Sequence, residues 1–184
     1  GPNPCGYITL PFTSVKDAID AMEAKGVKKG YIFLANDDIV DGTIEIPAGL
    51  DVQIASSPYA NLSGLPITKN IPGVNDGALA DKSYIDLDNE GVDSDSHGAV
   101  RSIKRGAGLT DTDPVFNVDK PGSKVQFYNI TVDGDNRDSK APLIDVSNGT
   151  VVFNAGTTVK NSKVSGTDTA GAVRVSGNGN LKLN

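Results

Sequence analysis

Several residue types are rare or absent in this sequence. Among its 184 residues there are no tryptophans, one cysteine and one histidine. The single cysteine, Cys5, cannot form an intrachain disulfide, because no second thiol is present. The single histidine, His97, makes a zinc site or a Ser-His-Asp triad hard to build. A disulfide scaffold and a histidine-based catalytic centre are therefore poor explanations of this chain.

The sequence also has no excess of positive charge and no long apolar run. Its formal net charge is −6, whereas a nucleic-acid binder needs a basic face for the phosphates. The same charge disfavours binding to anionic membranes. No stretch approaches the roughly 18 apolar residues of a membrane-spanning helix. We therefore expect no nucleic-acid partner and no membrane insertion.

What the sequence does contain is a repeat in its last third. Three short apolar runs, at 115–118, 143–146 and 172–175, end in valines that are 28 and 29 residues apart. Each run is followed by a turn of Gly, Asn or Pro, and then by a second run in which apolar and polar residues alternate. Alternation is typical of strands, and no copy contains a helical pattern. Short strands that recur at this interval predict a stacked solenoid.

Stacking of the copies predicts columns of equivalent residues. One inward column should contain Val118, Val146 and Val175, and a second should contain Val125, Val151 and Leu181. Asparagines follow the second runs at positions 129, 154 and 184. Asparagine tolerates the left-handed backbone conformation, so we expect corners of the coil at these positions.

The amino-acid sequences of these copies resemble those of a known family. Residues 146–154 (VSNGTVVFN) and 171–183 (GAVRVSGNGNLKL) are similar to repeats in large Gram-positive surface proteins, often adhesins. Their fold is the right-handed parallel β-helix of the pectate-lyase-like superfold. The resemblance implies an all-β chain on the bacterial cell surface, outside the cell. It does not imply one activity, because this fold carries lyases, glycosidases, tailspikes and adhesins.

One amphipathic helix is expected before the strands, from about Val15 to Lys25. Ser14 and Asp17 form an N-cap signal, and Gly26 suits the C-terminal cap. The apolar face follows helical spacing and comprises Val15, Ala18, Ile19 and Met22. We expect this helix to cap the first rung of the coil, where it would protect an exposed sheet edge.

The rest of the chain suggests one domain with an insertion. Residues 1–13 are an extended lead-in that starts with a tag scar, and residues 14–184 form a single β-helix domain. Residues 31–56 are expected to be the first rung. Residues 57–113 break the pattern and are expected to hold one irregular rung plus a long excursion. The apolar pattern is still running at the last residue, so we expect a fragment whose protein continues beyond 184.

The insertion carries the candidate ligand-binding residues, because functional groups often lie on long loops of a regular scaffold. These are Tyr59, Tyr84, His97, Arg101 and Arg105, whose side chains stack on sugars or hydrogen-bond to them. The alternatives are that the two tyrosines only pack against the fold and that the arginines only balance the charge of the nearby acidic residues.

Two acidic clusters were weighed as metal or catalytic sites. Asp93 and Asp95 begin a calcium-loop pattern, but Lys104 stands where an EF-hand needs Glu. A looser calcium site and a solvated acidic loop both remain open. The second cluster, at 133–138, has the carboxylates and arginine of a lyase site, but its Gly-Asp-Asn core is also ordinary turn chemistry. No catalytic residue is assigned, and no cofactor is required.

Two functions follow from these observations. The first is a non-enzymatic adhesin module, or the solenoid that presents one. Its ligand would be a glycan or a host surface protein, and the fragment is expected to be a monomer. The alternative is a carbohydrate-active enzyme, either a polysaccharide lyase or a glycoside hydrolase. An enzyme should show carboxylates converging with Arg or Lys on one strand face.

Overall fold

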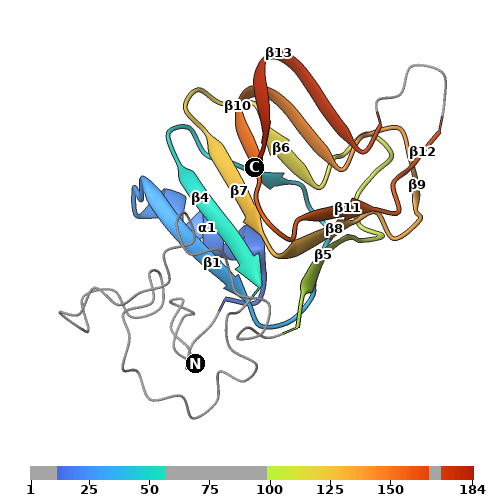
Figure 1. Ribbon diagram of the computed structural model, residues 1–184, viewed down its shortest axis with the longest axis horizontal. Helices are drawn as coiled ribbons and strands as arrows, with labels where there is room; N and C mark the ends of the chain where they lie inside the picture. The colour runs from blue at the N-terminus through green and yellow to red at the C-terminus, as the bar shows by residue number, and fades with distance from the viewer. Residues whose placement is uncertain (1–11, 57–98, 166–170) are drawn as a thin grey trace.

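The computed structural model describes residues 12–56, 99–165 and 171–184. These residues form one α-helix, α1 (Val15–Ala24), and strands that pair with one another only in parallel. The sheets curl around a common apolar interior (Figure 1). An all-β chain with parallel strands and one short helix is confirmed, and the curled sheet is compatible with a solenoid.

The largest sheet has seven strands. Its members are β1 (Lys29–Leu34), β4 (Asp51–Ser56), β7 (Lys124–Tyr128), β10 (Ile144–Phe153), β6 (Phe116–Val118), β3 (Ile44–Glu45) and β13 (Val173–Leu183). The long strand β10 joins two parts of this sheet, since its first half pairs with β6 and its second half with β7. Gly149 lies between the halves with φ 104°, a conformation that favours glycine.

Two smaller sheets complete the coil. The first has four strands: β11 (Thr158–Lys160), β8 (Ile130–Asp133), β5 (Arg101–Arg105) and β2 (Asp38–Val40). The second pairs β12 (Lys163–Val164) with β9 (Asp138–Ser139). Strand β5 falls within residues 57–113, where the sequence predicts one irregular rung, and it pairs regularly with β2 and β8.

The strand register confirms the predicted columns. Val146 pairs with Val118 on one side and with Val175 on the other. Val151 likewise pairs with Val125 and Leu181. Equivalent residues of successive copies therefore lie beside one another in neighbouring strands.

Of the three asparagines predicted at corners, Asn129 has the left-handed backbone expected there, whereas Asn154 and Asn184 do not. Asn129 has φ 51°, in the left-handed region that asparagine tolerates. The side-chain Nδ2 of Asn184 donates to Oδ1 of Asn154 at 2.8 Å, so the amides of consecutive turns hydrogen-bond along the coil.

The first turn of the coil is shorter than the sequence indicates. Residues 31–56 were expected to be one rung, but β1 and β4 are paired neighbours in one sheet, with Lys29 beside Asp51. They therefore occupy the same side of the coil in consecutive turns. The apolar pattern gives the strands but does not show which of them stack.

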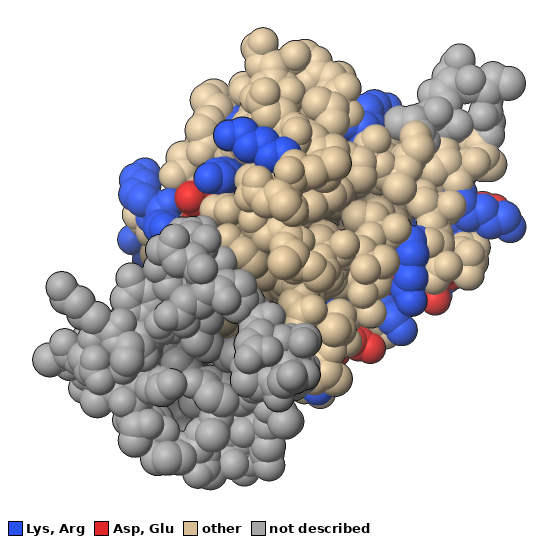
Figure 2. Space-filling view, viewed as in Figure 1, with Lys and Arg blue, Asp and Glu red and all other residues tan. Residues whose placement is uncertain are grey.

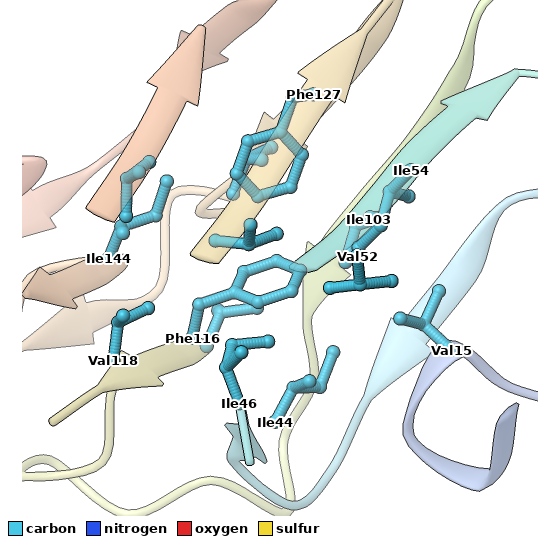
Figure 3. Close-up of a cluster of buried hydrophobic side chains, with 14 of the residues drawn as sticks. Val15, Ile44, Ile46, Val52, Ile54, Ile103, Phe116, Val118, Phe127 and Ile144 are labelled. Carbon is cyan, nitrogen blue, oxygen red and sulfur yellow. The ribbon is translucent and has the colours of Figure 1, made fainter. Parts of the chain in front are cut away.

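The interior is apolar and α1 closes one end of it. Phe116 and Phe127 are fully buried, with ring centroids 5.1 Å apart in an edge-to-face arrangement. From α1, Val15 and Ile19 join the same core (Figure 3). Ser14 Oγ accepts a hydrogen bond from the amide of Asp17 at 3.1 Å, as the N-cap signal predicts. In the described part of the chain, α1 is too short and too polar to cross a membrane.

Candidate functional site

Four polar residues form a line across the outer face of the seven-stranded sheet, which we call the polar column. Glu45 of β3 pairs in register with Asn117 of β6, which pairs with Asp145 of β10, which pairs with Arg174 of β13. Their neighbours Ile44, Phe116 and Ile144 are fully buried, so alternation turns the polar column outward.

Hydrogen bonds link the members of the polar column in pairs. Asn117 Nδ2 donates to Glu45 Oε2 at 2.8 Å. Arg174 Nε donates to Asp145 Oδ1 at 3.1 Å, and its Nη2 also donates to Asp145 Oδ2, which makes the contact bidentate. Lys120 lies beside the column, with Nζ 3.5 Å from Glu45 Oε2 and 3.1 Å from Asp119 Oδ1.

The polar column is accessible and strongly charged. About half of each of the Glu45 and Arg174 side chains is exposed, whereas Asp145 lies deeper, with 16% of its side chain exposed. The hydrogen bond that Arg174 donates to Asp145 raises the pKa of Arg174, and partial burial opposes this effect. The guanidinium is therefore a permanent cation that holds the Asp145 carboxylate in place.

The polar column can bind polar groups, and it holds two carboxylates on one face of the sheet. Glu45 and Asp145 are two strands apart, which places their backbones about 10 Å apart. Inverting glycosidases hold their carboxyl groups about 6.5–9.5 Å apart, with one acting as acid and the other as base. Here each carboxylate already accepts hydrogen bonds from a neighbour of the column.

Of the five predicted ligand-binding residues, the structure describes two. Arg105 is 3% exposed, and its guanidinium donates to the backbone oxygens of Asp113 at 2.5 Å and Thr110 at 2.6 Å. Burial lowers the pKa of Arg105, while Asp113 and Asp111 raise it. This side chain supports a turn and presents almost no surface to a ligand.

Arg101 is half-buried at the start of β5. Its amide donates to Ser56 Oγ at 2.7 Å, and the same hydroxyl donates to the carbonyl of Asn129 at 2.5 Å. Residues 56 and 101, which flank the undescribed span 57–98, are thus joined by one hydrogen bond. Tyr59, Tyr84 and His97 lie outside the described residues, so ligand binding there stays a prediction.

The second acidic cluster has the geometry of a turn. Asp133 is 6% exposed, and its Oδ1 accepts hydrogen bonds from the amide of Asp135 at 2.8 Å and from Asn161 Nδ2 at 2.9 Å. Asp135 and Asn136 have φ near 54°, the left-handed conformation. The Asp133 carboxylate therefore organises a corner between consecutive turns of the coil.

Metal binding was predicted at Asp93 and Asp95, which lie outside the described residues. Within residues 12–56, 99–165 and 171–184, no three His, Cys, Asp or Glu side chains are grouped so as to hold a metal ion. Charged side chains on the face drawn in Figure 2 lie mostly around its margins, and no single patch of one sign covers it.

Sequence reasoning missed the polar column, although a signal for it exists. In each copy the polar residue stands between two apolar residues of the first run, as in Ile44-Glu45-Ile46 and Ile144-Asp145-Val146. Glu45 lies 72 residues before Asn117, the next member of the polar column, because the insertion stands between them. Aligning the first rung with the C-terminal copies would have placed Glu45 and Asp145 on one face.

Comparisons with protein-family models, with curated proteins and with solved structures give no match. The resemblance to bacterial surface proteins therefore rests on the sequence repeats alone.

Proposed function

We propose that this chain is a right-handed parallel β-helix and acts as a non-enzymatic adhesin module, or as the solenoid that presents one. It works outside the cell on a bacterial surface, where it binds a glycan or a host surface protein. The repeat of 28 and 29 residues, the parallel register and the asparagine corners support the fold. The resemblance to Gram-positive surface repeats supports the location.

The polar column is the observation that carries the binding function. It aligns carboxylate, amide and guanidinium groups on consecutive strands of a rigid sheet. Hydroxyl-rich glycans are recognised by such alternating donors and acceptors, and Arg adds planar, paired hydrogen bonds. Because the scaffold is built from paired strands, little conformational entropy is lost when these groups bind.

The insertion is proposed as a second contact region. Arg101 is the first residue of β5, and Tyr59, Tyr84 and His97 belong to the sequence before it. Asp93 and Asp95 are proposed as ligands for calcium. These residues extend a binding surface, and the proposal does not depend on Arg105.

A glycoside hydrolase is the second candidate, and one observation favours it. Glu45 and Asp145 share one outward face with Arg174 and Lys120, which is the convergence expected of an enzyme. Against it, Asp145 is held by the bidentate contact with Arg174. A general acid must carry and release a proton, which this cation opposes.

A glycan array, probed with and without calcium, tests the binding function. For a glycan that binds, Arg174→Ala should weaken affinity about tenfold, the effect of losing one charged hydrogen-bonding group. Lys163→Ala is the matched control, because Lys163 forms an exposed ion pair with Asp138 on another sheet. Loss of binding in both variants would place the contact elsewhere.

The same protein should release neither reducing sugar nor unsaturated uronate from a polysaccharide panel. Release that disappears in both Glu45→Gln and Asp145→Asn would replace the adhesin proposal with the hydrolase. Absence of binding to every glycan and host surface protein tested would leave neither function standing.

A further inference from the structure

One inward position of the seven-stranded sheet lacks the side chain that its equivalents carry. In neighbouring strands the register aligns Gly30, Val52, Val125, Val151 and Leu181. Val52, Val125 and Val151 are fully buried and fill the interior of the coil. Gly30 of β1 is buried as well, but it has no side chain to fill the same level. The sheet therefore leaves a space at β1, where the following strands carry a branched apolar residue.

Met22 of α1 occupies this space. A β-carbon at position 30 would lie 2.5 Å from Sδ and 2.8 Å from Cε of Met22, closer than non-bonded atoms approach one another. The backbone does not require glycine there, since the φ of Gly30 is not positive. Close to this contact, the amide of Val27 donates to the carbonyl of Met22 at 2.9 Å and ties the end of α1 to the turn before β1. The thioether of α1 thus replaces the side chain that β1 lacks, and it seats the helix on the coil.

The thioether of Met22 is open to oxidation. Met22 is the only methionine of the chain, and it is half-buried at the margin of the core, where a small peroxide can reach it from solvent. With hydrogen peroxide, a sulfur lone pair attacks one oxygen, and the S–O bond forms as the O–O bond breaks. The proton of the attacked oxygen passes to the second oxygen, which leaves as water. The sulfur is oxidised to the sulfoxide, and the peroxide is reduced.

The sulfoxide does not fit the position that the thioether occupies. Its additional oxygen is polar and bulky, and it loses hydrogen bonds to water when it lies against the apolar interior. Val15 and Ile19 of α1 are at most 2% exposed, so they stay buried only while α1 is seated on the coil. Displacement of Met22 would weaken the packing of this whole face.

We propose that Met22 is an oxidation site, and that its conversion to the sulfoxide by a peroxide loosens α1 from the end of the coil. Reduction of the sulfoxide seats the helix again, so the modification is reversible. The proposal does not depend on the proposed glycan binding.

Thermal melting of the full chain before and after peroxide treatment tests the proposal. All chains carry Cys5→Ser, so that Met22 is the only sulfur present. The folded chain should gain one oxygen and melt about 5 °C lower. Methionine sulfoxide reductases should then restore the original Tm. Met22→Leu is the matched control, because it keeps an apolar side chain of similar size without sulfur, and its Tm should not respond to peroxide.

A second set of variants tests whether Met22 fills the space at Gly30. Gly30→Val gives β1 the residue that the following strands carry, and it should lower the Tm because it expels the thioether. Adding Met22→Ala removes the clash and should recover much of this loss, although Met22→Ala alone lowers the Tm. No recovery in the double variant would overturn the proposal. So would an oxidised chain that melts like the untreated one, an equal response of Met22→Leu to peroxide, or oxidation of Met22 only after unfolding in urea.

Discussion

Arg105 shows how a residue type can suggest a ligand site and yet serve the fold. The sequence offered it as a ligand-binding cation close to Arg101. In the structure the two arginines are at opposite ends of β5, and the guanidinium of Arg105 turns back to the carbonyls of Thr110 and Asp113. Local sequence cannot reveal this, because nothing in the residues 110–113 shows that their carbonyls will face a guanidinium of β5.

Replacing Arg105 by Met should therefore lower the free energy of unfolding. The variant keeps an apolar stem of similar length but leaves two carbonyls without their donors, at a cost of about 3 kcal/mol. Lys104→Met, on the same strand and half-buried, should change stability by less than about 0.5 kcal/mol. Urea unfolding measures both, and equal effects would contradict the structural role of Arg105.

Asp38 should make stability depend on pH. Burial raises its pKa, the hydrogen bond from the Val15 amide (2.9 Å) opposes this, and Asp17 and Asp41 raise it further. Because the folded pKa exceeds the unfolded one, the stabilising contribution is complete below about pH 4 and is lost as pH rises through the folded pKa. Asp38→Asn removes this titration and keeps an acceptor for Val15.

The free energy of unfolding of the wild type minus that of Asp38→Asn should therefore fall as pH is raised from about 3 to 7. Asp20→Asn, which removes an exposed carboxylate from the neighbouring helix α1, reports the effect of one lost charge. A difference that stays constant, or that grows with pH, would show that the assigned direction is wrong.

At the scale of elements, the sequence predicts the helix and the repeated strands, whose residues recur at regular intervals. It does not predict which strands from distant parts of the chain pair with one another. The helix and the C-terminal strand columns follow from the positions of Val15, Ile19 and the repeated valines. The stacking of β1 on β4 and the polar column do not, because each joins residues from different turns. The pairing of Glu45 with Asn117 also depends on where the insertion ends, and local patterns do not contain that information.

The helix α1 should stabilise the coil by covering its end. Ile19 is 1% exposed, so Ile19→Asp buries an unpaired charge and should cost about 4 kcal/mol. Ala24→Asp introduces the same side chain at an exposed position of α1 and should cost less than about 1 kcal/mol. Thermal melting compares the two, and a small effect of Ile19→Asp would show that α1 is not a cap.

At the scale of the whole molecule, all proposals rest on stacking of equivalent strands. The polar column exists only if Glu45, Asn117, Asp145 and Arg174 lie on consecutive strands. Composition supports such a chain, because its 21 glycines and 10 prolines favour many turns. Composition does not give the order of the strands in the sheet, which is defined by the register in which they pair.

Methyl–methyl nuclear Overhauser contacts measure that register directly. Stacked copies should give strong contacts between the methyl groups of Val118 and Val146, Val146 and Val175, and Val151 and Leu181, since neighbouring strands are about 4.8 Å apart. Val118 and Val175, two strands apart, should give a weak contact or none. Absence of the three neighbour contacts in a folded chain would contradict the stacked coil, and with it the polar column.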